Sequence, residues 1–152
     1  MNQIFRTSKR TLKILAACVW LIGGIALLRG GLQQFQGARE LNPSGGWMWV
    51  FLGAGSLLGL FQAVTIFSRS CRKNIRRIDQ LQDPRLWQFF RPGFFGALTG
   101  MISAGVLLDH WSHGHYFFSL FVAGLDIALT ISLLGSSYVF WTDWLRGEIR
   151  NE

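Results

Sequence analysis

One acidic residue, Asp126, lies well inside a long apolar segment near the C-terminal end of the sequence. In a helix, at about 1.5 Å per residue, it would sit ~15 Å from the start of that segment, near the middle of a bilayer. An ionised carboxylate there costs at least ~2.5–3.5 kcal/mol, so we expect it to face other helices or water, or to carry a proton. Thr130, one helical turn further on, would share its face, and Thr99 and Ser103 are candidate hydrogen-bond partners from the preceding apolar segment. These residues predict either a proton- or cation-coupled site or a neutral carboxyl that joins neighbouring helices.

All three histidines of the chain fall close together, directly after an aspartate. The cluster consists of Asp109, His110, His113 and His115. Imidazole and carboxylate groups are ligands for zinc and copper. Their spacing matches no established metal motif, however, and a short polar connection is a natural place for histidine. A metal site is therefore one interpretation and a polar surface connection is the other.

No catalytic or cofactor motif stands out elsewhere in the chain. Cys18 and Cys71 form no C-x-x-C pair, which argues against a dithiol redox centre and a thiolate zinc site. No serine belongs to a G-x-S-x-G motif, and no histidine lies in an apolar segment where it could activate one. A haem held between helices needs axial ligands from different segments, which one histidine cluster does not supply. We therefore predict neither an enzyme nor a bound cofactor.

Basic residues gather in the connection between the second and third apolar segments. They include Arg69, Arg72, Lys73, Arg76 and Arg77. Ile75, Ile78 and Leu81 recur among them at helical spacing, which predicts a short amphipathic helix at the membrane interface. These bases could bind anionic lipid headgroups or an acidic partner, at ~1 kcal/mol per base near a surface. Alternatively, they serve only to fix the orientation of the chain in the membrane.

Small residues repeat every four positions in two apolar segments. The two ridges are Gly96, Gly100 and Ala104, and Gly124, Ala128, Ser132 and Ser136, with a shorter version at Gly55 and Gly59. Such small-xxx-small ridges let transmembrane helices approach closely. We expect them to pack inside the molecule, with a homo-oligomer or a larger membrane complex as the alternative.

Four apolar segments are long enough, or nearly so, to position these residues as transmembrane helices. A span needs ~20 apolar residues, with ~17 to 25 as the usual range. We predict an all-α integral membrane protein of four transmembrane helices, arranged as two antiparallel hairpins in a single domain. The predicted spans are about 12–32, 46–68, 92–109 and 115–141, with a cytoplasmic basic loop over 69–91 and polar outer connections at about 29–45 and 109–115.

Charge is distributed unevenly along the chain. Half of the 152 residues are apolar, 15% are charged, and the formal net charge is +7. With four spans, thirteen of the fifteen Lys and Arg residues lie on one side, and only Arg29 and Arg39 on the other. Because basic loops stay inside, both termini and the basic loop are predicted to be cytoplasmic, in a cell membrane such as a bacterial inner membrane. Bases that flank apolar segments point to the lipid bilayer, not to nucleic acid, as the partner.

Two functions fit these features. The first is a non-catalytic subunit or scaffold that packs with other membrane proteins through the small-residue ridges. The second is a small transporter or channel component that uses Asp126 as a proton- or cation-binding group.

Overall fold

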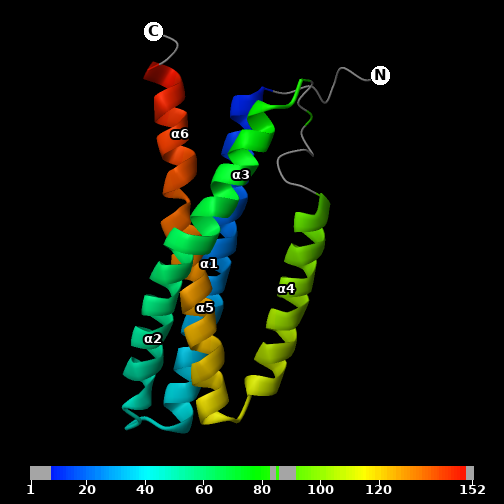
Figure 1. Ribbon diagram of the computed structural model, residues 1–152. Coiled ribbons are helices and arrows are strands. Elements are labelled where there is room, and N and C mark those ends of the chain that lie inside the picture. The colour runs from blue at the N-terminus through cyan, green and yellow to red at the C-terminus, as the bar shows by residue number, and fades with distance from the viewer. Residues whose placement is uncertain (1–7, 83–84, 86–91, 150–152) are drawn as a thin grey trace.

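The computed structural model describes residues 8–82, 85 and 92–149, and these are almost entirely helical, without strands. Figure 1 shows long helices that run along a common direction. The elements are α1 (Lys9–Leu41), α2 (Trp47–Gln62), the π-helix η1 (Ala63–Phe67), α3 (Ser68–Asp79), α4 (Pro92–Ser112), α5 (Tyr116–Ser136) and α6 (Tyr138–Ile149).

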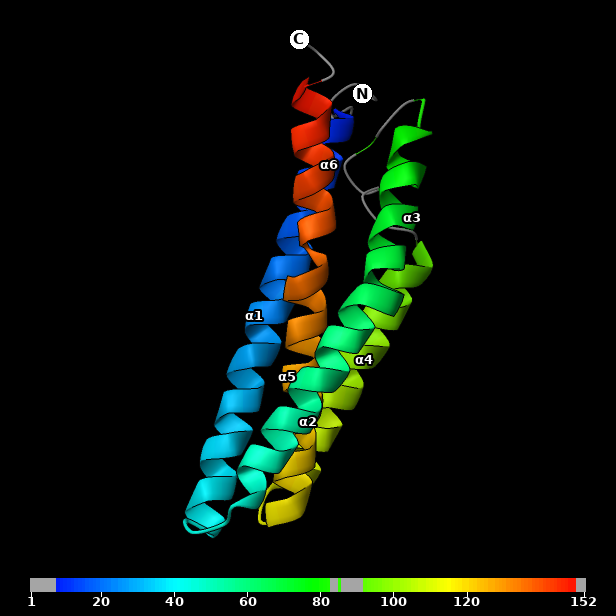
Figure 2. The ribbon, with the colours of Figure 1, turned by 60° about the vertical axis from the view of Figure 1, so that its left-hand side comes forward.

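Three helical rods are long and apolar enough to cross a membrane: Lys9–Leu41, Trp47–Asp79 and Tyr116–Asp143. The second rod joins α2, η1 and α3, and the third joins α5 and α6 (Figure 2). The all-helical fold with membrane-type helices is thus confirmed. α4 covers the third predicted span, while the count of four spans stays a prediction.

The π-helix lets α3 continue α2 with a changed direction. The Ser68 hydroxyl donates to the carbonyl oxygen of Ala63, five residues back, at 2.6 Å. Such an i−5 bond stabilises a π-turn, in which the helix takes up one extra residue. The basic segment therefore begins as a continuation of the second rod and not as a separate helix.

α5 lies between α1 and α2 and forms the centre of the bundle (Figures 1 and 2). Its contact with α2 is close because glycines face one another. A Cβ atom on Gly55 would come within 2.5 Å of the carbonyl oxygen of Gly124, and one on Gly59 equally near that of Ala128. The Ser132 hydroxyl lies 3.0 Å from the Gly59 carbonyl oxygen. The prediction that the ridge from Gly124 to Ser132 packs inside the molecule is therefore confirmed.

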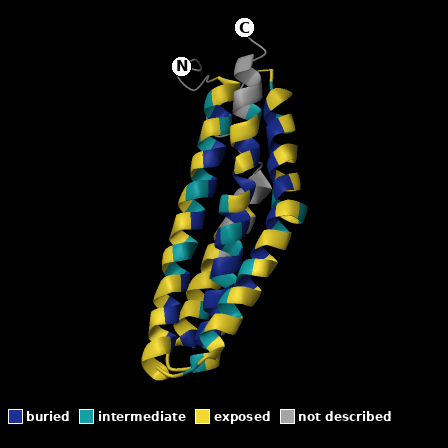
Figure 3. Cartoon of the chain, turned by 90° about the vertical axis from the view of Figure 1, so that its left-hand side faces the viewer, coloured by how far each residue is buried: buried dark blue, intermediate teal, exposed yellow. Residues whose placement is uncertain are grey.

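The buried side chains form two clusters, and exposed ones cover the outer faces (Figure 3). The cluster near the α1–α2 turn contains Phe35, Ala38, Leu120, Ala123 and Ile127. The cluster at the other end is built around Trp20, whose Nε1 donates to Ser136 Oγ at 2.8 Å and whose ring meets those of Phe67 and Phe140 edge to face. Large apolar side chains such as Ile22, Leu57 and Val64 are exposed, as suits a surface that faces lipid.

Part of the predicted outer connection is helical. We expected residues 29–45 to form a polar loop, but α1 continues to Leu41, which leaves only a short turn before α2. The helix ends at Asn42, because a residue before proline disfavours the α conformation. Polar residues such as Gln34 did not end it, since Phe35 and Ala38 still pack on α5.

The basic segment predicted to contain an amphipathic interfacial helix is helical over α3, but the interfacial helix itself is not confirmed. Ile75 and Ile78 are buried, and α3 packs on α1 and α6. The expected third apolar residue, Leu81, follows the end of the helix. The rest of the predicted loop, at 83–84 and 86–91, lies outside the described residues.

Candidate functional site

Asp126 and Thr130 share one face of α5, as the sequence predicted, and that face packs on α1. A Cβ atom on Gly30 would lie 3.2 Å from Asp126 Oδ2, and one on Gly31 would lie 3.1 Å from Asp126 Cβ. The Thr130 hydroxyl is buried and donates to the Gly24 carbonyl oxygen at 3.3 Å. The two glycines thus give the carboxylate room against α1, while Thr130 fastens the same two helices together.

The structure does not bring the predicted partners on α4 to Asp126. Thr99 and Ser103 are exposed, and within the described chain no hydrogen bond joins either of them to Asp126. Figure 1 shows why: α4 diverges from α5 away from the turn that connects them. The helix that comes close to Asp126 is α1, because Gly30 and Gly31 remove the side chains that would hold it away.

Gln34 joins α1 to the end of α4, and the sequence analysis missed it. Its side-chain amide donates to Asp109 Oδ1, and its oxygen accepts a hydrogen bond of 2.9 Å from the Ser112 hydroxyl. Gln34 is only 8% exposed. We had assigned it to a loop. If the predicted helix continues past Arg29, Gln34 lies four residues from both Gly30 and Ala38. This spacing places Gln34 on the side of α1 that faces α5.

These residues form a polar seam, which we define as Asp109, Ser112, Gln34, Asp126 and Thr130. The seam begins at the α4–α5 turn and follows the α1–α5 contact into the apolar part of the bundle. Carboxylate, amide and hydroxyl oxygens of this kind can hold a proton, a hard cation or water.

The histidine cluster does not gather into a ligand set. His110, His113 and His115 are exposed, and His113 Nδ1 lies 2.8 Å from the Asp109 main-chain oxygen. The Asp109 carboxylate contacts Gln34 instead. Among the residues that the structure describes, no group of three or more His, Cys, Asp or Glu side chains could hold a metal ion. Gly114, between them, has φ +83°, so a residue without Cβ suits this turn.

At the other end of the bundle, Lys13 links three helices. Its Nζ lies 2.8 Å from Asp79 Oδ1 on α3 and 2.6 Å from Asp143 Oδ2 on α6. The Lys13 side chain is 18% exposed. Lys9, one turn earlier, donates to the main-chain oxygen of Asp79 at 2.6 Å. The beginning of α1 is therefore fixed to α3 and α6 by charge.

The structure separates the five predicted basic residues into different surroundings. Arg72 and Arg76 line a cavity between α3 and α6, while Arg69 and Lys73 are exposed outside it. Arg77 is half-buried and has an interaction partner. The four exposed bases share one face of α3, but only Arg72 and Arg76 among the five line the cavity.

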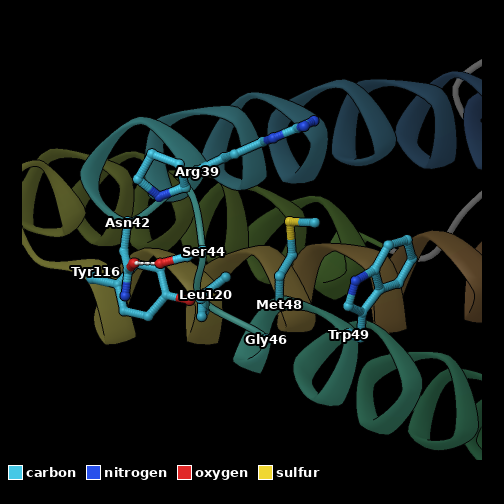
Figure 4. A pocket seen from close by; sticks show the side chains of 10 residues that line it. Arg39, Asn42, Ser44, Gly46, Met48, Trp49, Tyr116 and Leu120 are labelled. Carbon is cyan, nitrogen blue, oxygen red and sulfur yellow. Dashed lines mark hydrogen bonds between the residues drawn. The ribbon is translucent and has the colours of Figure 1, made fainter.

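A second cavity, of about 240 Å³, lies at the α1–α2 turn (Figure 4). Arg39, Asn42, Met48 and Trp49 are among its lining residues. Tyr116 closes it from α5, and its buried hydroxyl has no hydrogen-bond partner within the described residues. A Cβ atom at the neighbouring glycine of the turn would collide with that hydroxyl. Tyr116 therefore packs the start of α5 against the turn.

Among the residues that the structure describes, the ridge on α4 has no partner, contrary to expectation. Gly96, Gly100 and Ala104 are exposed, and nothing lies within 4 Å of a Cβ atom built on either glycine. The described side chains between them and the end of α4 are also mostly exposed, for example Ile102 and Val106. The small-residue ridge of the central helix α5 packs on α2, so it is not available to the ridge on α4.

Comparison with known proteins adds no assignment to this geometry: no family model, no curated protein and no solved structure matches the chain.

Proposed function

We propose that the chain is a non-catalytic scaffold subunit of the membrane, which self-associates through α4. The observation that carries this proposal is the contrast between two ridges of the same kind. The ridge of Gly124 and Ala128 packs on Gly55 and Gly59, whereas no described part of the chain lies within 4 Å of a Cβ atom built on Gly96 or Gly100. In lipid, helices associate mainly where small residues let their backbones approach.

A second copy is the occupant that this ridge fits best. Ridges spaced by four residues are self-complementary, because two identical helices can interlock about a two-fold axis. The α2–α5 contact is an example, within this chain, of one glycine ridge set against another. A pair formed through α4 would leave the packed bundle of α1, α2 and α5 unchanged.

The proposal includes a fourth span and an orientation. Lys9, at the start of α1, contacts the end of α3, while Tyr116, at the start of α5, packs on the α1–α2 turn at the opposite end. The chain between α3 and α5 must return along the bundle, and α4, at about 1.5 Å per residue, is long enough to cross ~30 Å of hydrocarbon. The end that carries α3 and the start of α1 holds most of the bases, so we place it and both termini in the cytoplasm, at the inner membrane of a bacterium.

The test is the oligomeric state of the purified protein in mild detergent. We expect Ala104→Cys, made in a Cys18→Ser background, to form a disulfide-linked dimer on mild oxidation, because the two ridges face each other. We expect Gly100→Leu to weaken the dimer at least about tenfold, since its side chain keeps the backbones apart.

Matched controls come from α2. Gly53 is also exposed, with open space around its Cβ position, so Gly53→Cys and Gly53→Leu should neither cross-link nor dissociate the dimer. A protein that is monomeric at all concentrations would refute the self-association. A stoichiometric complex with a different chain, sensitive to Gly100→Leu, would instead assign the ridge to another membrane protein.

Asp126 supports a second candidate function, a proton- or cation-coupled transport component. The carboxylate is half-buried against α1, lacks a hydrogen-bond partner within the described chain, and continues the polar seam that starts at Asp109. On this reading, Asp126→Asn should reduce pH-driven ion flux into proteoliposomes at least about tenfold and leave the melting temperature nearly unchanged. Glu40→Gln, at an exposed position of α1, is the control. Flux that is absent from the wild-type protein, or equal in the variant, would exclude this function.

A further inference from the structure

The cavity between α3 and α6 has a volume of about 540 Å³. α3 and α6 pack against each other at the end of the bundle where α1 begins (Figures 1 and 2). The walls of the cavity carry Arg72 and Arg76 from α3 and Tyr138 and Thr142 from α6. The buried residues Ile75 and Val139 also line it. Two guanidinium groups and two hydroxyl groups therefore border the same space.

Arg72 and Arg76 contribute no polar interaction to the described part of the fold. Neither has a hydrogen bond or ion pair with another residue that the structure describes, and both are exposed. The acids at the edge of the cavity, Asp79 and Asp143, are already held by Lys13. The guanidinium groups can thus turn towards a ligand without breaking an internal ion pair.

The position of the cavity along the bundle is that of a lipid headgroup. On the second rod, Val64 and Ile66 are exposed apolar residues, and the bases begin directly after them at Arg69. On the third rod, Tyr138, which lines the cavity, and Trp141 are exposed aromatic residues. Amphipathic aromatic rings favour the level of the headgroups, and arginines beyond them meet the phosphates.

We propose that this cavity binds the phosphate of an anionic phospholipid through Arg72 and Arg76, with the Tyr138 hydroxyl donating a hydrogen bond; the Thr142 hydroxyl already donates to the Val139 carbonyl oxygen. A guanidinium group can donate two parallel hydrogen bonds to phosphate oxygens, which gives the site specificity beyond charge. The acyl chains would contact exposed apolar side chains of the second rod, such as Val64. A dissolved phosphate ion would offer the same oxygens without those apolar contacts, so the lipid is the tighter ligand.

The experiment titrates the detergent-solubilised full chain with short-chain phosphatidylglycerol and follows thermal stability. We expect Arg72→Gln/Arg76→Gln to weaken the apparent Kd at least about tenfold, because the charge-assisted hydrogen bonds from both guanidinium groups to the phosphate are lost. The control Arg69→Gln/Lys73→Gln removes the same charge from the same helix but outside the cavity, and it should change the Kd less than about twofold. Tyr138→Phe, which keeps the charge, should weaken binding a few-fold.

Each outcome decides the proposal. If both double variants weaken lipid binding equally, general charge attraction explains the binding and the proposed site is refuted. Short-chain phosphatidylcholine binding as tightly as phosphatidylglycerol would exclude the preference for an anionic headgroup. Inorganic phosphate that stabilises the protein at the same concentration as the lipid would assign the cavity to a soluble anion instead. Because Arg72 and Arg76 form no hydrogen bond or ion pair with another described residue, the variants are expected to fold, and an unchanged helical circular dichroism spectrum checks this.

Discussion

Replacement of Gly59 by alanine is expected to lower the free energy of unfolding by about 1–3 kcal/mol, and Gly55→Ala/Gly59→Ala by more. A Cβ atom at Gly59 would lie 2.5 Å from the Ala128 carbonyl oxygen and 2.9 Å from Ile131 Cβ. The carbonyl oxygen belongs to the backbone of α5, so no side-chain rotation can relieve the overlap. α2 must move away from α5, which also lengthens the contact between Ser132 and the Gly59 carbonyl.

Gly53 provides the control for this prediction on the same helix. It is exposed and has nothing within 4 Å of its Cβ position, so Gly53→Ala should leave stability unchanged or raise it by up to about 1 kcal/mol. Thermal and denaturant unfolding in a mild detergent compare the two variants. Equal stability of Gly59→Ala and Gly53→Ala would contradict the close α2–α5 contact.

The small-residue ridges show which features of the fold residue spacing can predict and which depend on the rest of the bundle. The spacing of Gly124, Ala128 and Ser132 predicted a close helix contact, because spacing by four places these residues on one helix face. The same spacing on α4 predicted internal packing and was wrong for Gly96 and Gly100. Periodicity identifies a face that can pack, but the partner depends on which helix occupies the centre, and that choice is made by the whole bundle.

The polar seam was predicted in part, for a similar reason. Asp126 and Thr130 were expected to share a face and do so, since their separation of four is a property of one helix. Their neighbour was assigned to α4, whereas Gly30 and Gly31 bring α1 close. Gln34 was missed because hydropathy marks where a helix leaves the membrane, not where it ends.

The ion pairs of Lys13 lay beyond sequence reasoning altogether. Its partners are 66 and 130 positions away, and the sequence offers many acids and bases near the same membrane boundary. The positive-inside count used Lys13 only as one of thirteen charges. Its particular role arises because three long helices extend together past the apolar part of the bundle.

Lys13→Met is expected to lower the free energy of unfolding by about 1–2 kcal/mol. The substitution keeps a long side chain but leaves the carboxylates of Asp79 and Asp143 next to each other without their shared cation. Removing one member of a buried ion pair costs several kcal/mol, but here Asp79 is half-exposed and Asp143 about one-third exposed, so water screens part of the loss. Lys9→Met, which removes a neighbouring exposed lysine with a hydrogen bond only to a main-chain oxygen, should cost less than about 0.5 kcal/mol.

Rescue by a second substitution separates charge from packing. In Lys13→Met/Asp143→Asn the repulsion between the two acids is gone, so we expect most of the lost stability to return, and the single variant to gain more from added salt than the wild-type protein does. A Lys13→Met protein as stable as the wild type, or one that Asp143→Asn does not rescue, would mean that packing alone holds α1 to α3 and α6. Because Asp79 and Asp143 also border the cavity between α3 and α6, loss of the lysine should loosen both of its walls at once. Lipid affinity and stability are therefore expected to fall together in Lys13→Met, whereas Arg72→Gln/Arg76→Gln should lower the affinity alone.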